Sequence, residues 1–187
     1  YIVNRSGPMS MAASLGVGFL KTTASVSRPD IQFHIQPFSS DDPTQGTHSF
    51  SAFTTSVTQL RPESTGFIKL KSANIFDHPK ISPCYLSHEI DIETIIKGVN
   101  IAMKIASAEP LRSSIEDMHS PGINELKGGG SGILEWIRRS AVTIYHPVGT
   151  CKMGSDKLSV VNHRLKVHGI DALRVVDASI MPRITSG

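Results

Sequence analysis

Alternating apolar and polar residues predict strands in the first part of the chain. Residues 30–36 alternate with a period of two, which is typical of a half-buried strand. Residues 49–60 are rich in Phe, Thr and Val and predict a second strand, and a turn at 61–66 leads into a third at 67–71. Three consecutive strands with short returns indicate an antiparallel sheet.

The next segment carries its apolar residues at helical spacing, which predicts a helix over residues 90–108. One face of that helix would pack on the sheet, and its members are Ile92, Ile95, Ile96, Val99, Met103 and Ala106. A glycine run at 128–132 indicates a loop or the entry to a second helix over 133–141. The order of elements predicts an α+β fold: one antiparallel sheet with helices on one side.

Composition narrows the class of protein only a little. The chain has 187 residues, 39% of them hydrophobic, which suits one domain with a sizeable core. The net charge of +3 is spread over a mixed surface, so the basic residues predict solvation and not nucleic-acid binding. No apolar run is long enough to span a bilayer. The first residues lack the features of a signal peptide, and a start on Tyr1 suggests a fragment.

Most cysteine, histidine and phenylalanine residues favour structural roles. Cys84 and Cys151 are far apart, so we expect two buried thiols and a cytoplasmic protein, with membrane association left open. Seven histidines show no paired spacing for a metal, so we expect solvated or structural roles and no metal site: His34, His48, His78, His88, His119, His163 and His168. Four phenylalanines are expected in the core, with a substrate-lining role as the alternative: Phe33, Phe38, Phe50 and Phe53.

The remaining histidine, His146, occupies a more informative setting. It ends an apolar run that begins at Val142, and Pro147 follows it. Gly149 and Gly154 bracket a tight loop, because glycine permits backbone conformations closed to other residues. A histidine held in one place can act as a base near neutral pH, although most histidines are structural or exposed.

A second informative segment follows at residues 173–182. It predicts a short buried strand that delivers Asp177 and Ser179 to a loop. A carboxylate at the end of such a strand can serve a ligand site. The commoner alternative is an aspartate that caps a local turn.

Together, residues 145–154 and 173–182 resemble the C-terminal signature of the glucose-methanol-choline (GMC) oxidoreductases, which oxidise alcohols with FAD. The resemblance rests on the motif His-Pro-Val-Gly-Thr-Cys-x-Met-Gly followed by Val-Val-Asp-x-Ser-x-x-Pro. Weaker similarity extends through residues 61–87, and residues 4–8 resemble the family's entry into its substrate domain. Relatives usually carry Asp-Pro where this chain has Asn162 and His163, which we interpret as a loop variation.

The resemblance implies a function and a set of site residues. Residues 1–187 would be the C-terminal substrate-binding domain of an FAD-dependent alcohol dehydrogenase or oxidase, similar to the choline dehydrogenase branch. Such an enzyme oxidises a primary alcohol to an aldehyde by hydride transfer to flavin. His146 corresponds to the catalytic base, and residues 146–187 would face the flavin through Val148, Gly149, Asp177, Ala178 and Ser179. By this correspondence, a second catalytic residue would lie just beyond Gly187.

The family's phosphate-binding glycine motif is not evident in the chain. Gly16 and Gly18 supply two glycines without the third, and the run at 128–132 has the wrong spacing. The resemblance therefore implies an N-terminal FAD domain before Tyr1 as a partner, beside the alcohol substrate, and no FAD bound to this chain alone. A lyase of the same family and a non-catalytic binding domain remain as alternatives.

Overall fold

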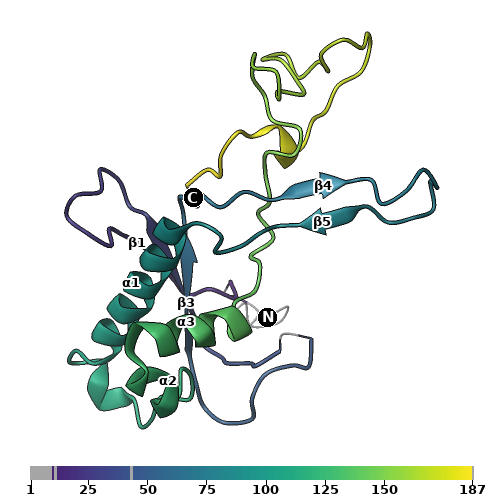
Figure 1. Ribbon diagram of the computed structural model, residues 1–187. Coiled ribbons are helices and arrows are strands. Elements are labelled where there is room, and N and C mark those ends of the chain that lie inside the picture. Colours follow the sequence, from purple (N-terminus) through teal and green to yellow (C-terminus); the bar gives the residue numbers. More distant parts are fainter. Residues whose placement is uncertain (1–9, 11, 43, 187) are drawn as a thin grey trace. The chain divides into compact units, whose positions relative to one another are not determined.

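The structure is a computed structural model that describes residues 10, 12–42 and 44–186 (Figure 1). The chain divides into two compact units. The first comprises Tyr1–Gln59 and Ile90–Ala141, and the second comprises Leu60–Glu89 and Val142–Gly187. The predicted entry segment at 4–8, like Gly187, lies outside the described residues.

The first unit contains a three-stranded antiparallel sheet in the order β1-β2-β3. Its strands are β1 (Gly16–Leu20), β2 (Ile31–Gln36) and β3 (Thr54–Gln59). The predicted strand is confirmed as β2, with Ile31 and Phe33 buried, but the alternation stops before Ile35, which is 42% exposed. Strand β1 was not predicted, since two glycines among five residues weaken the strand signal. Its pairing with β2 is what makes it a strand.

Helix α1 (Glu89–Ala106) confirms the predicted helix, but its closest approach to the sheet lies on a different face. A Cβ atom at Gly98 would lie 2.6 Å from Val57 Cγ1 of β3 and 3.4 Å from Ile31 Cγ2 of β2. The buried residues of α1 are Asp91, Thr94, Gly98 and Val99, whereas Ile92, Ile95 and Ile96 are only half-buried. The face of α1 that contacts the sheet differs from the predicted one because glycine, which has no side chain, lets the helix approach more closely than isoleucine would.

A buried polar contact accompanies this close packing. Gln59 Nε2 at the end of β3 donates a hydrogen bond of 2.8 Å to Asp91 Oδ1 in α1. Asp91 is only 1% exposed, so its carboxylate depends on such donors. Helix and sheet are therefore joined at this end by hydrogen bonding as well as by apolar contact.

The glycine run enters a helix and is not a loop. Helix α2 (Ile123–Lys127) is separated by Gly128 alone from α3 (Gly129–Ser140), which begins four residues before the predicted start. A Cβ at Gly132 would overlap Glu125 O, so glycine is what lets the two helices join so closely. Ile133 and Ile137, one turn apart, are the buried residues of α3.

The predicted third strand belongs to a separate sheet in the second unit. Strands β4 (Phe67–Lys69) and β5 (Lys80–Ser82) form an antiparallel pair in which Phe67 lies opposite Ser82 (Figure 1). The prediction of one sheet was therefore wrong in this detail, whereas the antiparallel α+β class is confirmed. A Cβ at Gly66 would overlap Ser82 O, so a glycine at this position allows β4 and β5 to pair closely.

Several expectations about individual side chains are now settled. Phe33 is 3% exposed and belongs to the core, whereas Phe50 and Phe53 are 50% and 41% exposed. Cys84 and Cys151 are free thiols, and both are half-buried where full burial was expected. Among the described residues, no helix is both long and apolar enough to cross a membrane.

Candidate active site

The two signature segments, residues 145–154 and 173–182, lie side by side in the second unit. Backbone hydrogen bonds to Ser179 O come from Gly149 N at 3.1 Å and from Cys151 N at 3.0 Å. A third runs from Met153 N to Ile180 O at 2.7 Å. The structure thereby brings Gly149, and Val148 next to it in the chain, beside the turn that contains Asp177 and Ser179.

His146 is presented on an irregular, exposed stretch of this unit. No hydrogen bond or ion pair of its imidazole with another described residue is present. Tyr145 before it has a φ of 61° and donates its N–H to Thr143 Oγ1 at 3.0 Å. The left-handed region costs a non-glycine residue about 1–2 kcal/mol. Four other described non-glycine residues share it, so this strain does not single out His146.

The glycines that bracket the loop are required by its conformation. Gly149 has a φ of 89°, a region that glycine enters without penalty, and its Cβ would lie 3.6 Å from Met181 O. A Cβ at Gly154 would overlap Ser159 Oγ. The prediction of a tight loop between these two glycines is confirmed.

A small lobe over residues 152–176 supports the loop. Val161, fully buried, forms bridges with Met153 and Val167. Asp156 accepts hydrogen bonds from Ser159 Oγ at 2.7 Å and Lys152 Nζ at 3.0 Å. The Ser159 hydroxyl, and then Lys152, hold the pKa of Asp156 well below its usual range, so this carboxylate is charged at neutral pH.

The position that departs from the family pattern forms a local turn in this lobe. Asn162 Oδ1 accepts hydrogen bonds from Arg164 N at 2.9 Å and from Lys166 N at 3.2 Å. Asparagine is favoured in such turns because its side chain can satisfy backbone N–H groups. The sequence variation thus lies in a turn and has a local structural explanation.

Asp177 caps the 3-10 turn η3 (Ala178–Ile180). Its Oδ1 accepts a hydrogen bond of 2.8 Å from Ser179 N. The Ser179 hydroxyl first, and its backbone N–H second, lower the pKa of Asp177 from its ordinary value of 3.8. The capping role named as the alternative for Asp177 is therefore present in the structure. Ala178 is exposed beside it, and Ser179 is half-buried.

The predicted buried strand before Asp177 was wrong. Residues 173–176 form one isolated bridge, between Arg174 and Lys166. Leu173 is 47% exposed and Val176 is 70% exposed. An apolar run forms a buried strand only where partner strands and a core cover it, and in this unit the run faces outward.

Neither glycine-rich segment forms a phosphate-binding turn. Gly16 and Gly18 lie within β1, and the run at 128–132 forms the junction of α2 with α3. The fold that binds a dinucleotide needs a glycine turn between a strand and the helix that follows it. Neither segment therefore offers such a site.

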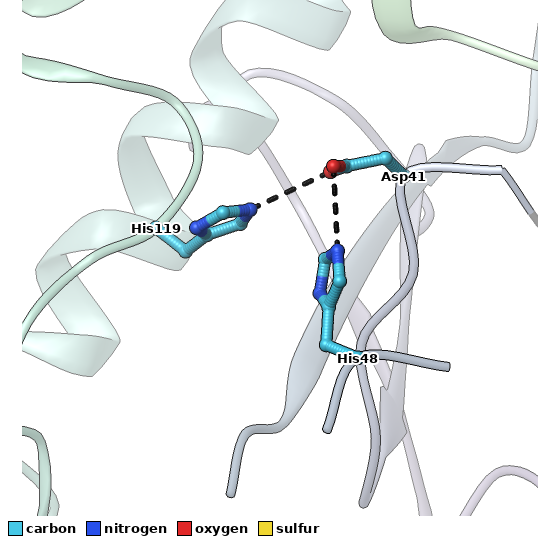
Figure 2. Close-up of side chains that lie close together, drawn as sticks. All are labelled: Asp41, His48 and His119. Carbon is cyan, nitrogen blue, oxygen red and sulfur yellow. Dashed lines mark ion pairs between the residues drawn. The ribbon is translucent and has the colours of Figure 1, made fainter. Parts of the chain in front are cut away.

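The structure also brings together three side chains that sequence spacing did not connect. Asp41, His48 and His119 lie within the first unit with their carboxylate and imidazole groups adjacent (Figure 2). The two histidines were expected to be solvated or structural. Their separation along the chain gave no signal, because loops of different parts of the unit deliver them.

Comparison with known proteins establishes the relationship suggested by the signature. Residues 62–187 match the family model described as GMC oxidoreductase. The chain belongs to the GMC oxidoreductase family. It is 40% identical over 187 residues to a Pseudomonas putida protein named alcohol dehydrogenase [acceptor], covering 100% of this chain and 34% of the relative. It is also 40% identical over 172 residues to the mitochondrial choline dehydrogenase of Mus musculus, covering 91% and 28%.

Solved structures agree with this assignment to the GMC family. The crystal structure of pyridoxine 4-oxidase from Mesorbium loti matches with a TM-score of 0.78 and 25% identity, over 94% of this chain and 34% of that one. This GMC chain therefore spans about a third of the length of the proteins it matches. Its fold and family are those of the GMC oxidoreductases.

Proposed function

We propose that this chain is the C-terminal, substrate-binding portion of an FAD-dependent alcohol dehydrogenase or oxidase. The enzyme would oxidise a primary alcohol, choline or a similar compound, to an aldehyde. One observation carries the proposal: the backbone of Gly149 and Cys151 is hydrogen-bonded to Ser179, which joins the two signature segments beside His146. The relatives named alcohol dehydrogenase and choline dehydrogenase support the substrate class.

In this proposal His146 acts as the base. Its imidazole is exposed and engages no other described residue, so it is available to a substrate hydroxyl. Oxidation of an alcohol requires the hydroxyl proton to leave, and imidazole accepts a proton near neutral pH. FAD, when bound, supplies the oxidant that takes the hydride. Pro147 and the hydrogen-bonded backbone from Gly149 onward hold the chain that presents the ring.

The residues present fit part of an FAD site. Gly149 and Ala178 carry minimal side chains, so a flat ring or a ribityl chain can approach the backbone at both positions. Val148, Asp177 and Ser179 complete the proposed contact surface. The chain offers no glycine turn for the pyrophosphate among its described residues, so we assign that half of FAD to an N-terminal domain.

Exposed apolar side chains in the second unit support such a partner domain. Val142, Tyr145 and Val176 are 74%, 83% and 70% exposed, and each belongs to or flanks a signature segment. Apolar surface of this kind commonly marks an interaction site. We therefore propose that residues 146–187 face the flavin and its domain. The free thiols Cys84 and Cys151 favour a reducing compartment, and we place the enzyme in the cytoplasm.

Anaerobic mixing of the full-length protein with candidate alcohols tests this function. The yellow absorbance of bound flavin should bleach with a primary alcohol such as choline and recover with an electron acceptor. A lyase would convert its substrate while the flavin stays oxidised. A non-catalytic binding domain would carry no reducible flavin. Either of these two results would contradict the proposal.

A further inference from the structure

Asp41, His48 and His119 form a compact cluster on the first unit (Figure 2). Asp41 and His48 lie on the connection between β2 and β3, and His119 lies on the connection between α1 and α2. Each carboxylate oxygen of Asp41 faces one ring: Oδ2 lies 3.3 Å from His48 Nε2, and Oδ1 lies 3.5 Å from His119 Nε2. The three groups thus point toward one another from two separate segments.

We propose that this cluster binds a divalent transition-metal ion of the Zn²⁺ class. Two imidazole nitrogens and one carboxylate oxygen are ligands that such ions prefer over Mg²⁺ or Ca²⁺. Metal–ligand bonds of about 2.0–2.1 Å in a tetrahedron place neighbouring ligand atoms about 3.3–3.5 Å apart. The two Asp41–histidine distances, 3.3 and 3.5 Å, are close to that spacing, but each is to a different carboxylate oxygen, so the carboxylate must turn to present one oxygen to the ion.

Small rotations would complete the geometry. One ligand atom from each residue can be chosen so that all three lie within 4.8 Å of one another. The side chains of Asp41 and His119 are 77% and 53% exposed, so both have room to turn toward an ion. The His119 ring would turn against the rings of His48 and Phe50, whose centroids lie 4.9 and 5.4 Å away. A fourth position would remain open to water, as in zinc sites with three protein ligands.

The surroundings of His48 favour a ligand role. Ser39 Oγ lies 2.8 Å from His48 Nδ1, and the imidazole stacks on Phe50 with ring centroids 4.7 Å apart and planes inclined by 17°. When Nδ1–H donates to Ser39, the Nε2 lone pair faces Asp41. Metal-binding histidines commonly have such a partner on the second nitrogen, which fixes both tautomer and ring orientation.

The consequence of metal binding would be a cross-link within the first unit. His48 and His119 are 71 positions apart (119 − 48), on two connections that contain little regular structure. An ion bound by both would restrain these connections in the folded state, and the unfolded chain would have no preformed site. The ion would therefore stabilise the unit. The competing explanation is an ion pair between Asp41 and protonated histidines, with no metal.

Calorimetric titration of the purified, natural full-length protein with Zn²⁺ tests the proposal. We expect saturable binding whose affinity falls by about two orders of magnitude in Asp41→Asn and His119→Gln, which each lose one ligand. Both residues are exposed, so these variants should fold. Ser39→Ala should weaken binding by roughly tenfold, because it frees the His48 ring. His163→Gln, which alters an exposed histidine of the other unit, is the matched control and should bind like the wild type.

Thermal unfolding gives an independent readout. Zn²⁺ should raise the Tm of the wild type and of His163→Gln, and should raise it much less in His119→Gln, whereas Mg²⁺ should leave all three unchanged. The proposal is overturned if the wild type binds no Zn²⁺, or if Asp41→Asn and His119→Gln bind it as tightly as the wild type does. A difference in Tm among the variants without any Zn²⁺ dependence would identify an ion pair only, and would also overturn it.

Discussion

At the scale of single residues, the proposed chemistry depends on His146. Its replacement by alanine removes the group that would accept the hydroxyl proton but leaves the hydrogen-bonded backbone from Gly149 to Met153 in place. In the full-length enzyme, His146→Ala should therefore lower the rate of flavin reduction by alcohol by about 10² to 10⁴, with flavin content unchanged. Stopped-flow measurement under anaerobic conditions gives this rate. His163→Ala is the control, and equal rates in all three proteins would remove His146 from the mechanism.

A second residue-scale prediction concerns the cap at Asp177. Ser179→Ala removes the hydroxyl that contributes most to the lowered pKa of Asp177, whereas the backbone N–H at 2.8 Å remains. The pKa of Asp177 should therefore rise toward 3.8 without reaching it. Carboxyl carbon chemical shifts measured against pH would show the change. If Asp177 titrated identically in the wild type and the variant, the Ser179 hydroxyl would make no contribution to its lowered pKa.

The sign of the associated stability effect follows from the direction of the shift. A carboxylate whose folded-state pKa is depressed stabilises the fold above its unfolded value of about 3.8. That contribution is lost as the pH falls through the lower, folded-state pKa. The stability difference between wild type and Asp177→Asn should accordingly be present at pH 7 and shrink below pH ~4. Urea unfolding at several pH values checks it.

At the scale of elements, Gly98 determines how closely α1 approaches the sheet. Gly98→Ala would place a Cβ 2.6 Å from Val57 Cγ1, and the branched valine has little freedom to turn away. Overpacking of this kind costs about 1–3 kcal/mol, which exceeds the gain of up to about 1 kcal/mol from the better helix propensity of alanine. The net effect should be a lower free energy of unfolding.

Gly130 in α3 provides the matched control for this prediction. No atom lies within 4 Å of a Cβ built at Gly130, so Gly130→Ala should be neutral or stabilise by about 0.4–1 kcal/mol. Urea denaturation of both variants measures the contrast. If both glycines tolerated alanine equally, the contact between α1 and β3 would not be as close as the structure indicates.

At the scale of the whole molecule, we predict that the chain by itself does not retain FAD. The proposed contacts at residues 148–149 and 177–179 would meet only part of the cofactor. Few contacts would then have to offset the entropy cost of association. Purified chain mixed with FAD and desalted should be colourless and inactive. Stoichiometric flavin absorbance after desalting would show a complete cofactor site in this chain and contradict the division of FAD binding between two domains.

Much of the local organisation was predictable from sequence because it depends on neighbours along the chain. The strand at β2, the span of α1 and the glycines of the 149–154 loop each depend on nearby residues, and these three predictions are confirmed. The family signature was likewise predictable, since its residue types are contiguous within each segment. The roles of His146 and of the proposed flavin contacts stay predictions.

Tertiary structure decided the features that depend on distant partners. Strand β1 forms because it pairs with β2. Residues 67–69 pair with β5 in a separate sheet, and Gly66 allows the close approach of these two strands. The buried face of α1 was set by the approach of β3 to Gly98, which helical periodicity alone does not encode. Asp41, His48 and His119 meet only because folding closes two connections on each other, bringing together groups whose spacing along the chain carries no signal.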